Sequence, residues 1–308
     1  MRTQSLSIVI PAYNSERTLG ELVDRLLVVV PRLATSYEIL IVNDGSVDAT
    51  WSVIESIASA RAGVRGIDLV RNHGQHNALL CGIRAARHDV IVTMDDDLQN
   101  QPEDIPRLLE ALNAGADVVY GTPEQQQWSL ARNMASTVTK MVLQNVMGAR
   151  TARMVSGFRA FHRDARDAFA GYTARYVNID VLLTWGAARF VAVPVQHAPR
   201  RVGASNYTLR RLVRHTLDMM TGFSTYPLKV ATAIGFLFTA FGVGVLAWVL
   251  SRYAIYGVVA QGFTFLASII AIFSGAQLFA LGIIGEYLAR MFSRSMGQPS
   301  YTVRRQTF

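Results

Sequence analysis

Acidic residues are crowded into one short stretch, VTMDDDLQNQPED, which follows directly on an apolar run. Asp95, Asp96 and Asp97 are consecutive in it, although neighbouring carboxylates repel one another unless a cation or hydrogen bonds stabilise their charge. In an extended segment Asp95 and Asp97 point to one side and Asp96 to the other. Two carboxylates on one side suit Mg²⁺ or Mn²⁺, which keeps water and substrate phosphates in its remaining positions. The alternative is a solvated acidic turn without a ligand.

Gln99 points the same way if the chain stays extended, so it is the candidate for a third, neutral oxygen ligand. A metal held there would neutralise the charge that develops on a departing nucleoside diphosphate. The anomeric carbon of the attached sugar then becomes electrophilic, with oxocarbenium character. The stretch therefore predicts a metal-dependent site for a nucleotide sugar.

Strands and helices alternate over the first 200 or so residues and must position this stretch. Continuous apolar runs that end at Pro11, at Asp44 and at Asp95 are typical of strands covered on both faces. Helical stretches are expected over 15–29, 49–62 and 75–86, with Ser15 and Asp48 as candidate caps. This order predicts an α/β fold with a mostly parallel sheet, in which ligands bind beyond the carboxyl ends of the strands.

Several other sites are disfavoured by their missing signatures. The first strand is followed by PAYNSE, not by the GxGxxG of a dinucleotide-binding fold, and the chain has no GxxxxGK[ST] phosphate loop. His73 and His76 in RNHGQH invite a zinc reading, but no further cysteine or histidine motif accompanies them. The single cysteine, Cys81, excludes an internal disulfide.

Two long uncharged stretches, 230–250 and 254–285, predict a pair of transmembrane helices in this chain of 308 residues. The first apolar run, 6–10, is too short for a signal peptide. Basic residues lie on the outer flanks of the pair, so the positive-inside rule keeps both termini in the cytoplasm. The net charge of +8 fits anionic lipid, a phosphorylated substrate or nucleic acid.

Just before the first uncharged stretch, residues 208–223 alternate apolar and basic residues with helical spacing. A helix lying on the membrane surface is the favoured interpretation, and an ordinary core-facing helix is the alternative. The predicted organisation is a catalytic domain over 1–205, juxtamembrane helices over 206–227, and a transmembrane hairpin with its tail over 228–308.

The chain resembles the family 2 glycosyltransferases that load sugars onto polyprenyl phosphate, such as the dolichol-phosphate mannose synthases. The resemblance rests on these stretches, in order: SIVIPAYNSE, ILIVNDGSVDAT, RNHGQHNALLCGI, VTMDDDLQNQPEDIP, SGFRAFHRD, HAPRRVGASNYTLRRL and GAQLFALGIIGEYLARMF. RNHGQH and the last stretch are most similar to the bacterial undecaprenyl-phosphate 4-deoxy-4-formamido-L-arabinose transferases. The resemblance implies a GT-A catalytic fold, Rossmann-like with a mostly parallel sheet.

The resemblance also implies roles at matched positions. The metal would be held by Asp95, Asp97 and Gln99, and the nucleotide sugar would be bound by Pro11, Tyr13, Glu16, Asp44, Arg71, His76 and Asp96. The acceptor phosphate would meet Arg132 and Ser136 in WSLARNMAS. In RRVGASNY, Arg200 would be a catalytic arginine near both the donor and the acceptor phosphates, with Ser205 close by and Arg201 as the alternative to Arg200. Ala204 and Asn206 replace the glutamate and lysine usual in that motif, which puts the contacts there in doubt.

The expected reaction is an inverting transfer of one sugar from a nucleotide, expected to be UDP, to undecaprenyl phosphate, for lipid A or another envelope glycan. The reaction would take place at the cytoplasmic face of a bacterial inner membrane. The resemblance implies a homo-oligomer, expected to be a tetramer, and no nucleic acid partner is expected. Glucose, N-acetylhexosamine or mannose are alternative sugars. A processive polysaccharide synthase and a non-enzymatic membrane scaffold are alternatives from other classes.

Overall fold

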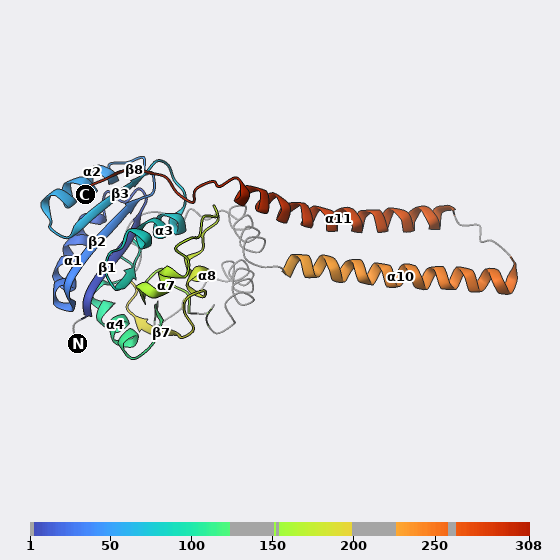
Figure 1. The fold of residues 1–308 in the computed structure, drawn as a ribbon, viewed down its shortest axis with the longest axis horizontal. Coiled ribbons are helices and arrows are strands. Elements are labelled where there is room, and N and C mark those ends of the chain that lie inside the picture. The colour runs from blue at the N-terminus through green and yellow to red at the C-terminus, as the bar shows by residue number, and fades with distance from the viewer. Residues whose placement is uncertain (1–2, 124–150, 152–153, 199–225, 258–262) are drawn as a thin grey trace. The chain divides into compact units, whose positions relative to one another are not determined.

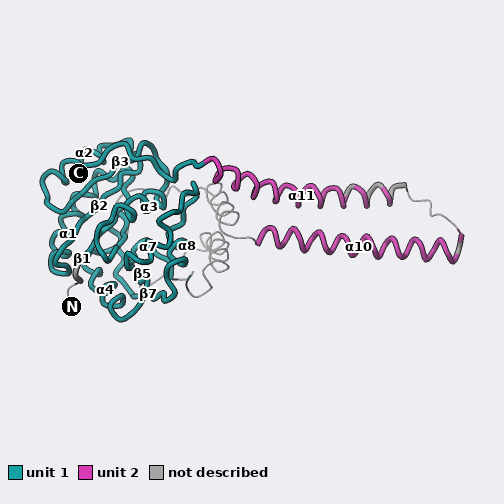
Figure 2. The backbone as a smooth tube through the Cα atoms, in the orientation of Figure 1, with its two compact units in different colours: residues 1–213, 297–308 teal, residues 214–296 magenta. Residues whose placement is uncertain are grey.

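The computed structural model describes residues 3–123, 151, 154–198, 226–257 and 263–308 (Figure 1). The chain divides into two compact units, drawn in different colours in Figure 2. Unit 1 comprises residues 1–213 together with 297–308, and unit 2 comprises residues 214–296. The C-terminal tail therefore belongs with the N-terminal domain, although the sequence alone grouped it with the hydrophobic pair.

Unit 1 is built on an eight-stranded sheet of order β7-β5-β6-β4-β1-β2-β3-β8 among the described residues. Its strands are β1 Thr3–Ala12, β2 Ala34–Asn43, β3 Val64–Leu69, β4 Val90–Thr93, β5 Val118–Pro123, β6 Arg159–His162, β7 Phe190–Val195 and β8 Val303–Gln306. Its helices are α1 Leu19–Leu33, α2 Thr50–Ala60, α3 Gln75–Ala85, the 3-10 turn η1 Pro102–Asp104, α4 Ile105–Asn113, α7 Arg163–Asp167 and α8 Ile179–Leu183.

The expectation of a mostly parallel sheet is confirmed. β1 pairs in parallel with β2 and β4, β2 with β3, and β5 with β7. Only β6 and β8 run antiparallel to their neighbours. Because β1, β2 and β4 run side by side in one direction, the segments that follow them meet at one edge of the sheet.

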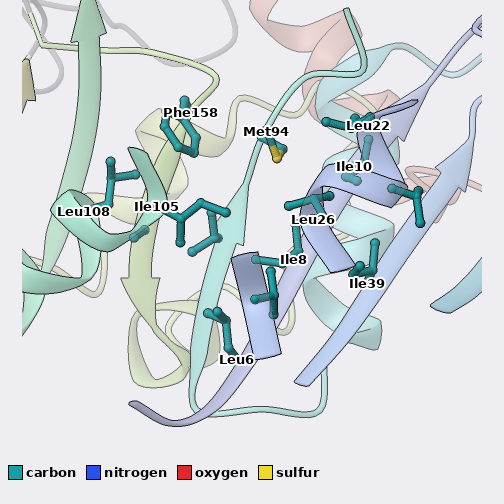
Figure 3. Packing of buried hydrophobic residues seen from close by; sticks show 14 of the residues in the cluster. Leu6, Ile8, Ile10, Leu22, Leu26, Ile39, Met94, Ile105, Leu108 and Phe158 are labelled. Atoms are coloured by element: carbon teal, nitrogen blue, oxygen red, sulfur yellow. The ribbon is translucent and has the colours of Figure 1, made fainter. Parts of the chain in front are cut away.

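Apolar side chains alternate between two covered faces of the sheet, which explains the continuous apolar runs in the sequence. Ile8 and Ile10 of β1 face the cluster that contains α1 and α4, with Ile105 and Phe158 (Figure 3). Val9 between them packs in a second cluster with residues of α3, α7 and α8. Burial on both faces fixes the register of β1 and thereby the position of the loop that follows it.

The first helix begins later than the sequence predicted, and the proposed cap is wrong. α1 starts at Leu19 with Thr18 as its N-cap residue, whereas Ser15 lies in the preceding loop and its hydroxyl donates to Asp96. At α2 the N-cap residue is Ala49, and the Asp48 carboxylate accepts from the backbone N–H of Thr50 at 3.0 Å. Asp48 therefore does serve the start of its helix.

Unit 2 contains the two long helices expected from the uncharged stretches, α10 Tyr226–Tyr256 and α11 Phe263–Ser295. Each is long and apolar enough to cross a membrane over Tyr226–Ile255 and Ile272–Ser295 respectively. Their large apolar side chains are exposed, Phe236 and Leu278 among them. At about 1.5 Å rise per residue, 20 residues cover a hydrocarbon core of about 30 Å, so both helices have length to spare.

Candidate active site

The three consecutive aspartates at 95–97, called here the acidic turn, follow β4, which ends at Thr93. Leu98 has a φ of 60°, a left-handed conformation that is unfavourable for a side chain of this size. The chain is therefore not extended from Asp97 to Gln99, and the geometric reason given for Gln99 as a third ligand is wrong. The Gln99 side chain donates weakly, at 3.4 Å, to the backbone oxygen of Ala198, so any contact with a metal remains a prediction.

The Asp95 carboxylate is held between α3 and the segment that leads into β6. Gln75, the first residue of α3, donates its side-chain N–H to Asp95 Oδ1 at 2.7 Å. On the other side, a Cβ atom placed on Gly157 would lie 2.6 Å from Asp95 Oδ2. Any other residue at 157 would displace the carboxylate from this position, so the glycine of the SGF motif leaves room for the acidic turn.

Asp96 joins the acidic turn to the loop after β1. Its Oδ2 accepts from the Ser15 hydroxyl and from the backbone N–H of Tyr13 at 3.3 Å. Burial raises the pKa of Asp96, and the neighbouring charge of Asp97 adds to this, while its hydrogen bonds act in the opposite direction. The middle aspartate thus fixes two loops to each other.

Asp44 directly follows β2 and holds the loop after β3. Its two oxygens accept from the backbone N–H groups of His73 at 2.7 Å and Gly74 at 2.8 Å. Burial raises the pKa of Asp44 to about 6, against the lowering effect of these two bonds. Contact with a nucleoside would use the remaining lone pairs of the carboxylate.

Gly45 shows how closely the two loops approach. Its φ is +64°, and a Cβ atom there would lie 2.3 Å from the backbone carbon of Arg71. The glycine of the NDG motif is therefore required by both conformation and space.

The loops after β1 and β2 are joined by hydrogen bonds as well. Asn14 receives a bond from Val47 N–H at 3.0 Å and donates its own N–H to the Ser46 hydroxyl at 3.0 Å. Glu16 accepts from Ala49 N–H at 3.0 Å, at the start of α2. Tyr13 is 48% exposed, so among these loop residues it offers an aromatic ring at the surface for stacking.

Other predicted donor-site residues have different surroundings. Pro11 is buried within β1, and Arg71 is exposed beside the loop that Asp44 holds. His76 Nδ1 accepts from the backbone N–H of Ile179 at 3.3 Å, so this ring contacts the start of α8.

The donor set at the acidic turn fits Mg²⁺ or Mn²⁺. Within the described part of the chain, no three His, Cys, Asp or Glu side chains converge as a metal site. Mg²⁺ commonly takes only one or two protein carboxylates and completes its shell with water and phosphate oxygens, so Asp95 and Asp97 suffice. A structural zinc site needs four protein ligands, which the surroundings of His73 and His76 do not supply among these residues.

The predicted acceptor residues lie outside the described residues: Arg132, Ser136, Arg200, Arg201 and Ser205. The same holds for the whole of the predicted amphipathic segment, 208–223. Sequence reasoning missed Ser15, Gln75 and Gly157 as partners of the aspartates. Gln75 and Gly157 stand in the motifs RNHGQH and SGF, which the resemblance includes, but no role was assigned to these two residues.

Comparisons with known proteins identify the family of the chain. The sequence model of the family described as "Glycosyl transferase family 2" matches residues 7–169. An undecaprenyl-phosphate 4-deoxy-4-formamido-L-arabinose transferase of Sodalis glossinidius is 33% identical over 307 residues, covering 99% of this chain and 94% of its own. The enzyme of that name from Klebsiella pneumoniae is 34% identical, covering 98% and 93%.

A solved structure shares the fold at low sequence identity. Glucosyl-3-phosphoglycerate synthase from Mycobacterium tuberculosis, in complex with Mn²⁺, UDP and phosphoglyceric acid, superposes with a TM-score of 0.53 at 20% identity. The match covers 71% of this chain and 76% of that one. The GT-A fold expected for the catalytic domain is thereby confirmed.

Proposed function

Because the chain belongs to glycosyltransferase family 2, we propose that it transfers one sugar from a UDP-sugar to undecaprenyl phosphate. The sugar we propose is 4-deoxy-4-formamido-L-arabinose, the one that names its relatives. The observation that carries the proposal is the similarity of this chain to these relatives along nearly its whole length, which includes the two apolar helices. A similarity limited to the nucleotide-binding half would support only the donor.

In the proposed reaction, an oxygen of the acceptor phosphate attacks the anomeric carbon of the donor sugar. The bond from that carbon to the diphosphate oxygen breaks, UDP leaves with the electron pair, and the anomeric centre inverts. The acceptor oxygen is already ionised at neutral pH, so the step depends on positioning and needs no strong general base.

The roles of the chain's own residues follow from the site. Asp95 and Asp97 would hold Mg²⁺ or Mn²⁺, which supplies positive charge to the diphosphate when bound. Tyr13 would stack on the base, while Asp44 and Asp96 keep the surrounding loops in place. Arg132 and Ser136, with Arg200, Arg201 and Ser205, are proposed to bind the acceptor phosphate.

The acceptor is a lipid, and the two apolar helices support a reaction at the membrane surface. We propose that both termini face the cytoplasm of a bacterial inner membrane, because the basic residues flank the helix pair on its outer sides.

A donor panel tests the proposal. The full chain in detergent or membranes is incubated with labelled UDP-sugars and undecaprenyl phosphate, with Asp97→Asn as the matched control. The expected product is a single-sugar lipid that extracts into organic solvent and is absent from the control. A long polymer would indicate a processive synthase, and no product from any donor would favour a scaffold.

A further inference from the structure

The C-terminal tail, residues 300–308, returns to the sheet of unit 1 after α11 has ended at Ser295. Its strand β8 runs antiparallel to β3, with Asp68 opposite Arg305 and Leu69 opposite Val303. β3 leads through Val70 into the loop 71–74, in which the backbone N–H groups of His73 and Gly74 donate hydrogen bonds to Asp44. The tail is thus in direct contact with an element of the candidate active site.

The tail contacts the chain on both sides of the loop 71–74. At the start, Val70 donates its N–H to Thr302 O at 3.0 Å, and Arg304 Nη2 donates to Val70 O at 2.6 Å. At the end, Asn77 Nδ2 donates to Ser300 O at 2.7 Å. Because Gln75, which donates to Asp95, directly follows this loop at the start of α3, a displacement on either side of the loop would reach the acidic turn.

A second path leads from the tail to the loop after β2. Arg305 Nε donates to Asp68 Oδ2 at 3.0 Å, and Asn43 Nδ2 donates to Asp68 Oδ1 at 2.7 Å. The Oδ1 atom of Asn43 in turn accepts from the N–H and the hydroxyl of Ser46. The Ser46 hydroxyl accepts from Asn14 N–H, in the loop after β1. A continuous hydrogen-bonded path therefore joins Arg305 to two loops of the site.

The bond from Arg305 to Asp68 is the first step of this path, and it matters because the Asp68 carboxylate is buried. The side chain of Asp68 is 3% exposed, whereas that of Arg305 is 50% exposed. A buried carboxylate that loses its guanidinium partner must move, take up a proton or admit water. Arg304 Nη1 lies 3.9 Å from Asp68 Oδ2, too far to take over the hydrogen bond that Arg305 makes. The position of Asn43 therefore depends on an arginine more than 200 residues away in the sequence.

We propose that the tail is a positioning element of the nucleotide-sugar site, with Arg305 as its principal positioning residue. Arg305 fixes Asp68 and, through Asn43, the turn that begins at Asp44. The backbone oxygens of Ser300 and Thr302 fix Asn77 and Val70, on the two sides of the loop 71–74. The inference rests on the proposed function, because the loops matter for catalysis only if they bind a nucleotide sugar.

The test compares Arg305→Ala with Glu55→Ala in the full chain in detergent. Glu55 contacts the same arginine at 3.6 Å but is itself half exposed, so its removal leaves the bond to Asp68 intact. Arg305→Ala should weaken UDP affinity and raise the KM for the donor by about tenfold, with a smaller change in kcat. Arg305→Lys should recover part of the loss, and Glu55→Ala should match the unaltered protein.

Asn77→Ala tests the other path and keeps the inference testable if Arg305→Ala does not fold. It removes the 2.7 Å bond to Ser300, together with a 3.2 Å bond to the backbone oxygen of Arg175, and should also weaken UDP binding. The inference is overturned if both variants melt at lower temperature yet bind UDP like the unaltered protein, because the tail would then be merely structural.

UDP affinity separates this inference from the proposed function. If the unaltered protein binds UDP but transfers no sugar to undecaprenyl phosphate, the proposed function fails while the Arg305 comparison still decides the role of the tail. If the unaltered protein binds no UDP, both proposals are overturned.

Discussion

Buried carboxylates in unit 1 are stabilised in two different ways. Glu38 contacts the Arg65 guanidinium and accepts from the Ser7 hydroxyl at 2.7 Å and from Arg87 N–H at 2.7 Å. Burial by itself would raise its pKa, but these partners outweigh burial and lower it. Asp44 accepts only neutral backbone N–H groups in its two hydrogen bonds, and burial raises its pKa to about 6.

The difference separates structural carboxylates from those of the site. Asp180, which contacts the Arg159 guanidinium and accepts from Tyr120 at 3.1 Å, belongs with Glu38. Asp96, bonded to a hydroxyl and a backbone N–H, belongs with Asp44. A carboxylate paired with arginine has its charge neutralised inside the fold, whereas burial raises the pKa of a carboxylate held only by neutral donors, as at Asp44 and Asp96.

The largest effect is expected from breaking an arginine-paired carboxylate. Asp180→Ala leaves Arg159, which is 2% exposed, buried without its partner. Removing one partner of such a pair typically lowers the free energy of unfolding by about 3–5 kcal/mol. Denaturant unfolding of the full chain in detergent measures this. Arg61→Ala, which breaks the exposed pair with Asp24 at 3.1 Å, is the control with an expected change below about 1 kcal/mol. Equal losses of unfolding free energy in the two variants would show that the buried arginine pair stabilises the fold no more than an exposed pair.

A metal-site carboxylate should show the opposite pattern. Asp97→Asn is expected to lower sugar transfer by more than about 100-fold, because even outer-shell partners of metal sites cost about 10- to 100-fold. The melting temperature should stay close to that of the unaltered protein. Near-normal turnover of this variant with added Mn²⁺ would exclude Asp97 as a ligand.

Gly157→Ala tests the room left for Asp95. The new methyl group would meet Asp95 Oδ2 at 2.6 Å, so the carboxylate must move. Displacements of about 1 Å in a catalytic geometry can cost about 100-fold, and we expect a loss of about 10- to 100-fold in kcat/KM. Gly171→Ala, where no atom lies within 4 Å, is the matched control and should keep full activity. Equal activities would show that Asp95 need not be held there.

The smallest effect concerns pH. The folded-state pKa of Asp44 lies at about 6, above its ordinary value of 3.8, so the folded protein takes up this proton first. As pH falls from 6 towards 3.8, protonation of Asp44 therefore adds to the stability of the fold, and that contribution is lost as pH rises through 6.

Protonation of Asp44 weakens its ability to accept hydrogen bonds from the loop 71–74. The affinity of the protein for a UDP-sugar should therefore fall as pH drops below about 6. The loss expected is about 2- to 10-fold, the range for one hydrogen bond. A UDP-sugar is the better ligand because its diphosphate is esterified at both ends and does not titrate there. Asp44→Asn should abolish the pH response, and an unchanged inflection in that variant would assign it to another group.

The sequence predicted the parallel sheet, the acidic turn and the two long helices because each depends on local patterns. Continuous apolar runs identified β1, β2 and β4, and the segments after them met at one edge as expected. Strand β8 was not predicted, because VRRQ is polar and gains its conformation from pairing with β3. Ser15 was misjudged because its partner, Asp96, lies 81 residues away.

The most direct measurement of the central claim is calorimetry of UDP binding to the purified full chain, with and without a divalent metal. If Asp95 and Asp97 bind the diphosphate through a cation, chelation should abolish most of the affinity, Mg²⁺ or Mn²⁺ should restore it, and Asp97→Asn should respond to neither. Undiminished UDP affinity after complete chelation, together with continued sugar transfer, would contradict the account.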